Sequence, residues 1–281
     1  MTNKNNISSK HHFIPQYYLK GFYNNENGFF VYSKEYGGIK FKKASQIFYE
    51  QNLHTLEYMG DKSVIIEKFY SQIEHEFSNI MELLQKEILS GKSIEVFGKS
   101  KDFHKILKII IALQFWRSPY NQELAQKFSH HILFLYDKTP KEIKDIFYHD
   151  RRFVKFLHRK RYNINILKAI QFVLLPLITF NFSSKTENKW TFFRAGEKNI
   201  YKFTTTDNPV LLSNNSDVFN YDGIYFPLSK ELVLVSTHKN EKLNTLNIIK
   251  FNEVLAQMAK KYVVSSSRDQ LEEIKSNFKN L

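Results

Sequence analysis

The segregation of hydrophobic patterns along the chain constrains its fold most strongly. From residue 61 to about residue 182, apolar side chains recur at helical spacing, as in Ile66, Tyr70, Ile73 and Phe77. On both sides of this block, short β-branched and aromatic runs are separated by Gly, Asn, Asp and Ser. Because strands and helices fall into separate blocks instead of alternating, the pattern predicts an α+β fold.

We expect a single domain, 1–281, in which a central helical block packs with a small N-terminal β unit and a C-terminal antiparallel sheet. Residues 1–60 would hold an N-terminal motif and a β hairpin, residues 61–182 the helical block, and residues 185–281 antiparallel strands plus C-terminal helices. The first long helix is expected from Asp61, as N-cap, to Leu89. The second is expected to kink at Pro119.

The composition excludes several classes of protein. With no cysteine, the chain has no disulfide, no thiolate zinc site and no cysteine nucleophile. The first ten residues are polar and lack the apolar core of a signal peptide. The longest apolar runs fall short of the ~20 residues that span a bilayer. We therefore expect a cytoplasmic protein with no membrane partner. Nucleotide-binding glycine loops, the G-x-S-x-G elbow and H-E-x-x-H are all absent.

The positive charge is concentrated in one segment. Of a net charge of +13, residues 141–200 contribute +8, since they carry 13 basic and 5 acidic residues. Such a local excess is typical of a surface that binds an anionic partner, and nucleic acid is the partner we expect. A solvated helix face in a lysine-rich protein explains the same charge equally well.

The stretch Lys10–Phe22 holds the densest group of chemically capable side chains. Adjacent His11 and His12 point in different directions, so one imidazole could act as a general base or metal ligand. Gln16 and Tyr17 add hydrogen-bonding groups a few residues later. The alternative is a loop in which the histidines hydrogen bond to the backbone.

A second cluster, Thr204–Val210, lies at a predicted strand end. Asp207 could orient a histidine or coordinate a divalent metal together with His12, and Asn208 stands beside it. The competing interpretation is a turn, because Asp-Asn-Pro is a good turn former whose Asp accepts hydrogen bonds from backbone amides.

Arg117 precedes the proline kink in W-R-S-P. Its guanidinium could clamp a phosphate or a carboxylate. The alternative is a salt bridge with Glu67 or Glu74 on the first long helix.

The basic run of residues 151–161 could follow a nucleic-acid backbone. The candidate phosphate-binding residues there are Arg151, Arg152, Arg159 and Arg161. The aromatic residues of the same stretch, Phe153, Phe156 and Tyr162, are expected to lie in the core.

Taken in order, these motifs resemble the DUF4238 family over nearly the whole chain. The matching segments are H-H-F-I-P-Q-Y-Y-L-K-G-F, I-F-Y at 47–49, I-E at 73–74, A-L-Q-F-W-R-S-P at 112–119, and F-T-T-T-D-N-P-V followed by F-P-L-S. The family supplies motif positions and no reaction. The resemblance implies as site residues His11, His12, Gln16, Glu74, Arg117, Asp207 and Asn208.

The opening H-H-F-I-P also looks like the start of an HNH nuclease motif. The residues nearest to completing it are Asn52 and His54. Their separation from His12 is too long for a standard motif, so the likeness hints at a reaction class only.

The function we expect is hydrolysis of nucleic acid, as in a toxin or phage-defence effector. His12 would be the general base or metal ligand, Asp207 its partner and Arg117 the phosphate clamp. Two alternatives stay open: a non-catalytic nucleic-acid or protein binding module in which the His-His motif is structural, and an enzyme acting on a small anionic metabolite.

Overall fold

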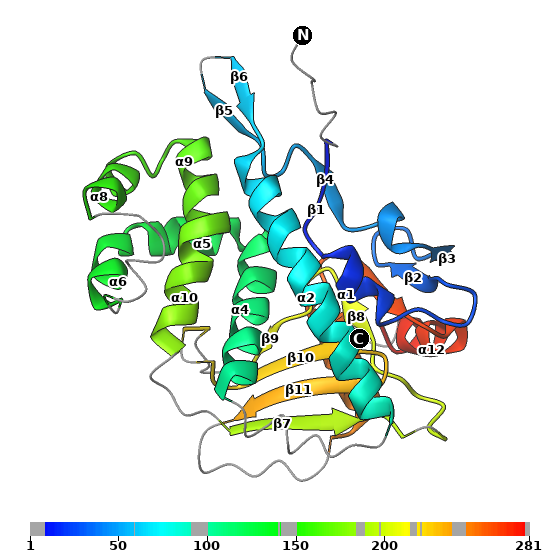
Figure 1. Ribbon diagram of the computed structural model, residues 1–281. Helices are drawn as coiled ribbons and strands as arrows, with labels where there is room; N and C mark the ends of the chain where they lie inside the picture. The colour runs from blue at the N-terminus through cyan, green and yellow to red at the C-terminus, as the bar shows by residue number, and fades with distance from the viewer. Residues whose placement is uncertain are drawn as a thin grey trace.

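The computed structural model describes residues 9–58, 60–90, 101–139, 141, 151–183, 189–196, 198–213, 218–219, 221–237 and 246–278. Helices and antiparallel sheets occupy separate parts of the molecule, so the predicted α+β class is confirmed (Figure 1). The helical block fills the upper left of Figure 1.

Two long helices define the helical block. Helix α2 (Ile65–Leu89) runs diagonally across the front of the molecule, and α4 (Lys101–Arg117) lies beside it (Figure 1). Asp61 is not the N-cap of α2, because the short strands β5 (Leu56–Tyr58) and β6 (Asp61–Ser63) form a hairpin first. Ser118 is extended, with ψ of 127°, and ends α4 where Pro119 was predicted to interrupt it.

Shorter helices complete the block. They are η2 (Pro119–Asn121), α5 (Gln122–Ser129), α6 (Ile132–Lys138), α8 (Arg151–Arg159), α9 (Ile164–Ala169), the π-helical η3 (Ile170–Leu174) and α10 (Leu175–Ser183). The sequence also predicts a short helix with Pro140 at its first position; Thr139 is the C-cap of α6, while Pro140 lies outside the described residues.

The π-helical turn η3 stands just before Pro176, the second residue of α10. Proline lacks an N–H, so it cannot donate to the carbonyl four residues earlier, which belongs to Phe172. That carbonyl accepts the Tyr70 hydroxyl of α2 instead, at 2.7 Å. This hydrogen bond ties η3 to α2.

The strands form two four-stranded antiparallel sheets. One contains β7 (Lys189–Arg194), β11 (Leu232–Thr237), β10 (Ile224–Ser229) and β9 (Leu211–Leu212), in that order. The other contains β3 (Ile39–Lys42), β2 (Phe29–Ser33), β12 (Tyr262–Ser265) and β8 (Thr205–Thr206). The predicted N-terminal hairpin is therefore extended by C-terminal strands. In Figure 1, β7, β10 and β11 lie below the helical block, β2 and β3 to its right, and the β5–β6 hairpin stands at the top.

The remaining elements frame these sheets. A two-stranded ladder joins β1 (Lys10–His12) to β4 (Tyr49–Gln51). Helix α1 (Gln16–Lys20) follows β1, and η1 (Ala44–Gln46) precedes β4. Helices α11 (Ile248–Met258) and α12 (Arg268–Phe278) stand before and after β12.

The largest group of buried apolar side chains draws on both ends of the chain and on the helical block. It reaches from Phe13 through Tyr70 and Trp116 to Phe226 and Val264. Among the residues described, no helix has the length and apolar character needed to cross a membrane.

Candidate functional site

Strand β1 places the two adjacent histidines in different surroundings. His11 pairs with Glu50 and His12 with Tyr49 in the ladder with β4. Successive side chains of a strand point to opposite faces, so the imidazoles diverge as predicted. His11 is fully buried, whereas His12 is partly exposed.

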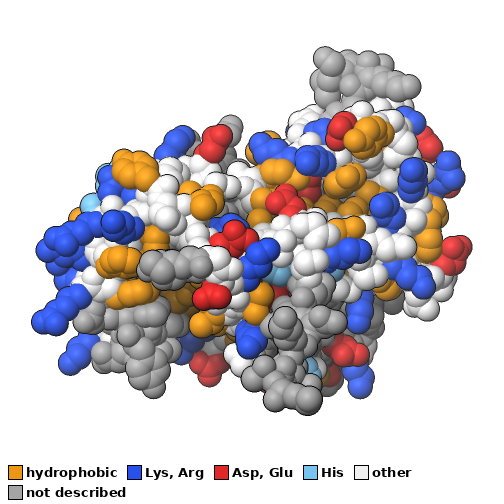
Figure 2. Space-filling view, turned by 90° about the horizontal axis from the view of Figure 1, so that it is seen from above, with side chains coloured by type: hydrophobic (Ala, Val, Ile, Leu, Met, Phe, Trp, Pro, Cys, Tyr) orange, Lys and Arg blue, Asp and Glu red, His pale blue; other side chains and the backbone are white. Residues whose placement is uncertain are grey.

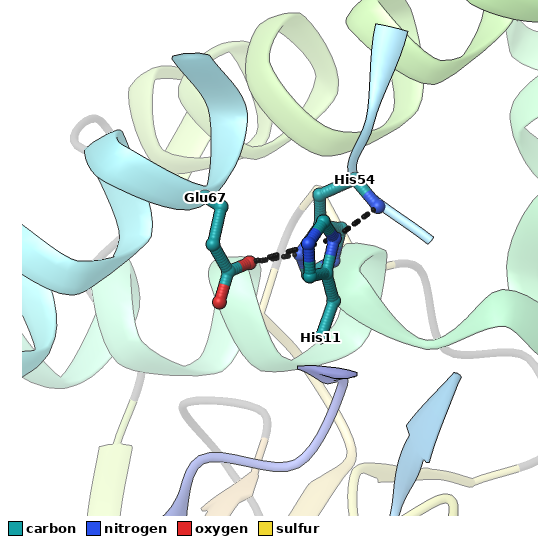
Figure 3. A group of neighbouring side chains, drawn as sticks. All are labelled: His11, His54 and Glu67. Atoms are coloured by element: carbon teal, nitrogen blue, oxygen red, sulfur yellow. Dashed lines mark hydrogen bonds and ion pairs between the residues drawn. The ribbon is translucent and has the colours of Figure 1, made fainter. Parts of the chain in front are cut away.

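The His11 imidazole belongs to a three-residue cluster with His54 and Glu67 (Figure 3). Its ring stacks on the His54 ring, with centroids 5.4 Å apart. His11 Nδ1 accepts the backbone N–H of His54 at 2.9 Å. The Glu67 carboxylate, from the first turn of α2, lies 2.6 Å from His54 Nδ1 and 3.9 Å from His11 Nδ1.

His54 owes its position to a tight turn. Asn52 has a positive φ of 54°, and its carbonyl accepts the Thr55 amide at 3.0 Å. Lys168 of α9 donates to the carbonyls of Asn52 and Thr55, at 3.3 and 3.0 Å. The turn is thereby fixed against the helical block, and the His54 side chain points inward.

The surroundings of the cluster decide where its protons lie. Burial lowers the pKa of His54 to about 4, although the hydrogen bond with Glu67 raises it. Burial raises the pKa of Glu67, but the hydrogen bond and charge of His54 and the Arg117 charge outweigh it and hold that pKa below its usual value. An ionised Glu67 therefore accepts from Nδ1–H of a neutral His54.

This arrangement leaves one buried nitrogen without a partner. With its proton on Nδ1, His54 carries a lone pair on Nε2, which has no hydrogen-bond partner among the described residues. A carboxylate that holds Nδ1–H and leaves Nε2 bare orients an imidazole as a proton acceptor.

The same three residues could hold a metal ion. Each offers one ligand atom, and these atoms lie within 4.8 Å of one another. Two imidazoles and one carboxylate are a ligand set found in zinc and non-haem iron sites. A cation between them would replace the proton that His54 shares with Glu67, and at His11 Nδ1 it would compete with the His54 amide.

A second polar group lies on the same face of α2. Tyr70 and Glu74 follow Glu67 by three and seven residues, which is helical spacing for one face. Arg117, at the end of α4, forms a buried ion pair with Glu74, and its guanidinium lies 4.3 Å from the centroid of the Tyr70 ring. The salt bridge considered from the sequence therefore exists, with Glu74 as the partner.

Hydrogen bonds to the backbone at the end of α4 fix the position of Arg117. Gln171 donates to the carbonyls of Trp116 and Ser118, both at 3.0 Å, on either side of Arg117. Arg117 itself is 2% exposed, and its Nε has no partner among the described atoms. The guanidinium is therefore held inside the protein, and Glu74 occupies the position in which an external anion would bind to it.

His12 and Tyr17 border this ion pair. Burial and the Arg117 charge lower the pKa of His12, against the opposing effects of the Ser45 backbone, Glu74 and Glu67. Its Nε2 lacks a hydrogen-bond partner in the described structure. Burial and the Glu74 charge raise the pKa of Tyr17.

Between these groups lies a cavity of about 10 Å³. Its lining includes Tyr17, Tyr70, Glu74, Gln114 and Arg117. That volume is about what one water molecule needs. Gln16, the remaining candidate of the opening stretch, is exposed at the start of α1.

Asp207 lies apart from the histidines and acts as the centre of a turn. Its buried carboxylate accepts the backbone N–H groups of Lys260, Lys261 and Tyr262, at 2.8, 2.6 and 3.3 Å. Burial raises its pKa, against these amides and the Tyr120 hydroxyl, which lower it. Asp207 thus accepts backbone amides, as one alternative from the sequence had it, but these amides belong to a distant segment, and the contacts join β8 to the start of β12.

Neither Asp207 nor its neighbour meets His12. Across the described residues, no hydrogen bond or ion pair connects Asp207 with His12. The Asn208 amide donates to Thr206 Oγ1 at 3.1 Å, within the same turn. The structure therefore groups the metal-capable side chains as His11, His54 and Glu67 instead of His12 and Asp207.

The basic candidates lie on the far side of the helical block. Figure 2 shows Lys and Arg side chains gathered at the left edge of that face, where Figure 1 places α8. Arg151 forms a two-point ion pair with Asp137, at 2.8 and 2.9 Å. Arg161 donates to the His158 carbonyl, while Arg152 and Arg159 are exposed.

Sequence reasoning considered His54 and Glu67 but assigned neither to the metal-capable group. His54 was considered only as part of an HNH-like nuclease motif, and Glu67 only as a possible salt-bridge partner of Arg117. No local pattern marks them, since 43 residues separate His11 from His54 and 13 more lead to Glu67. The pairing of β1 with β4 would have been the necessary signal.

Comparison with known proteins gives one match. The family described as "Protein of unknown function (DUF4238)" matches residues 10–269. No curated protein and no solved structure matches this chain.

Proposed function

The chain belongs to the DUF4238 family, and we propose that it is a metal-dependent hydrolase acting on nucleic acid. The observation that carries the proposal is the convergence of His11, His54 and Glu67 from β1, a turn and α2 (Figure 3). Buried ionisable groups are costly unless they are paired, and they concentrate at functional sites.

The ligand chemistry favours a divalent transition metal. Imidazole nitrogens suit zinc, iron and related ions, and a carboxylate completes a three-ligand set with room for water or substrate. Such an ion would activate water and polarise a phosphoryl oxygen. Metal binding at His54 Nδ1 needs the tautomer with its proton on Nε2, and His54, which is neutral above its pKa of about 4, would adopt it without releasing a proton near pH 7.

In this proposal, residues near the metal ligands assist the reaction by accepting a proton and by supplying positive charge. The unpartnered Nε2 of His12 is placed to accept a proton, and its lowered pKa keeps it neutral near pH 7. Arg117 supplies fixed positive charge nearby, and it reaches a phosphate only by exchanging Glu74 for it.

The charge distribution supports nucleic acid as the substrate. The segment 141–200 holds +8 of the net +13, and Arg152 and Arg159 of α8 are exposed to solvent. A polyanion is attracted to such a surface over distances of about a Debye length. A small anionic metabolite would gain much less, because it can engage few of these charges.

The test measures metal and cleavage on the same samples. Purified protein is stripped with a chelator, reloaded with zinc, manganese or magnesium, and assayed for bound metal and for cleavage of labelled RNA and DNA. We expect about one metal per chain and metal-dependent cleavage. Both should be lost in Glu67→Gln and kept in Glu82→Gln, an exposed carboxylate of the same helix.

A specific observation also favours a non-catalytic binding module. His11 and His54 are fully buried, and the hydrogen bond between them ties the His54 turn to β1. If this role is the whole one, Glu67→Gln lowers the melting temperature while no metal binds and no nucleic acid is cleaved. A folded wild-type protein that takes up no metal on reloading and cleaves neither RNA nor DNA would therefore reject the hydrolase.

A further inference from the structure

We propose that an exposed surface of α6 and α8 binds single-stranded nucleic acid by stacking bases on aromatic rings between cations. This surface, the α6–α8 patch, consists of Phe134, Arg152, Lys155, Phe156, Arg159 and Tyr162. The inference deepens the proposed function, on which its biological meaning rests, by naming single strands as the substrate class. Binding itself is measurable without any cleavage.

The first observation is the exposure of large aromatic side chains. Phe134 is 61%, Phe156 49% and Tyr162 71% exposed. The sequence predicts Phe156 and Tyr162 in the core, so their position at the surface is a finding of the structure. Grouped exposed rings on a folded protein mark binding surfaces, because leaving them in water is unfavourable.

The second observation is how α8 divides its residues. Val154 and Leu157 are buried and attach the helix to the molecule. The opposite face carries Arg152, Phe156 and Arg159, at helical spacing of four and three residues. Lys155 is exposed beside them. The outward face is therefore an aromatic ring surrounded by three cations.

The third observation is that these cations are available. Asp137, the acidic residue of α6, is already engaged by Arg151. Within the described part of the chain, no carboxylate pairs with Arg152, Lys155 or Arg159. Their charges can therefore be neutralised by an external polyanion.

The rings of Phe134 and Tyr162 each have a cationic side chain over one face. Lys138 Nζ lies 5.3 Å from the centroid of the Phe134 ring, and the Arg161 guanidinium lies 4.6 Å from that of Tyr162. A cation over one face of an exposed ring can neutralise a phosphate while a base stacks on the other face.

The layout of the patch favours a single strand over a lipid surface or a duplex. A helix that lies on a bilayer needs an apolar face to insert, and the apolar face of α8 is turned into the protein. The rings of a duplex are stacked on each other and cannot stack on protein side chains. Unpaired bases can, whatever their sequence.

The patch is connected to the histidine cluster through α9. From α8 the chain passes directly into α9, whose Asn165 hydrogen bonds with Glu57 of β5. Lys168 of α9 holds the turn that carries His54. Helix α9 therefore links the patch to the turn that carries one of the proposed metal ligands.

The experiment measures binding in chelator, so that no cleavage occurs. Fluorescence anisotropy of the full chain is recorded with labelled single-stranded RNA and DNA of ~12 nucleotides, within the site sizes of such proteins. Competition with a duplex of the same length and sedimentation with phosphatidylserine vesicles are run in parallel. We expect micromolar or tighter binding to single strands, weaker binding to the duplex and none to vesicles.

Variants locate the binding surface. Phe156→Ala should weaken binding about tenfold, whereas Tyr36→Ala, which removes a more exposed ring on the β2–β3 turn, should not change it. Replacing Arg152, Lys155 and Arg159 together by Ala should reduce the slope of log affinity against log salt by about 2. The charge-matched control replaces Lys20, Lys40 and Lys250, which are exposed elsewhere.

Several outcomes would overturn the patch. These are no binding of the wild type to single strands, equal affinity of patch and control variants, or binding to vesicles through the same cations. Binding without metal-dependent cleavage would keep the patch and reject the hydrolase. Cleavage with an unchanged KM in the patch variants would keep the hydrolase and reject the patch.

Discussion

The histidine cluster and the α6–α8 patch use similar residue types in opposite ways. In and beside the histidine cluster, Arg117 is buried, Glu67 and Glu74 are partly buried, and each has a specific counterpart, as Arg117 has Glu74 and Glu67 has His54. On α8, Arg152 and Arg159 point into solvent with no counterpart among the described residues. The comparison teaches that burial, more than residue type, separates a preorganised site from a docking surface.

The largest expected effect comes from opening the buried ion pair. Arg117→Leu leaves the partly buried Glu74 without its cation and should lower the free energy of unfolding by about 2–4 kcal/mol. Urea unfolding followed by tryptophan fluorescence measures this loss. The double variant Arg117→Leu/Glu74→Leu should recover part of it, and a double variant that is no better than the single one would argue against the pair.

The next effect concerns metal binding. If His11, His54 and Glu67 bind an ion, metal at 100 times its Kd stabilises the folded state by about 3 kcal/mol. Differential scanning fluorimetry of chelator-treated protein, with and without zinc or manganese, should show this as a rise in Tm. His54→Gln should lose the rise and His75→Gln, on the exposed side of α2, should keep it.

A smaller effect is expected from pH in metal-free protein. The pKa of His54 is about 4 in the folded state, below the 6.5 of the free imidazole. Between these values the unfolded chain binds a proton that the folded chain does not, so stability falls as pH drops from about 6.5 toward 4. The loss should be at least ~1 kcal/mol.

His54→Gln provides the control for this pH dependence. The variant cannot take up that proton, so its stability should change less with pH over the same range. Identical slopes for wild type and variant in urea titrations at pH 6.5 and 4.5 would show that His54 does not contribute.

The smallest effect on stability is expected from the α6–α8 patch. Phe156→Ala and Arg152→Ala remove exposed side chains from a helix, and alanine is a good helix former. Their free energies of unfolding should stay within about 0.5 kcal/mol of the wild type. A larger loss would mean that the ring packs structurally, and the contrast with the histidine cluster would disappear.

Much of the fold follows from local sequence. The apolar spacing from Ile66 to Phe77 defines the interior of α2, and Pro119 ends α4 where expected. The start of α2 was misplaced because Asp61, a good N-cap by type, belongs to a hairpin instead. Local patterns could not show this, because the residue type suits both a cap and a turn.

In the candidate site, too, some features follow from local sequence and others only from the tertiary structure. The sequence by itself determined the α+β class, the two diverging histidines and the place of Arg117 at a helix end before Pro119, since each depends on neighbours along the chain. Only the tertiary structure decided that His11 meets His54 and Glu67, that Asp207 anchors a turn, and that Phe156 is exposed. Contacts between distant segments depend on strand pairing and helix packing, which residue spacing does not encode.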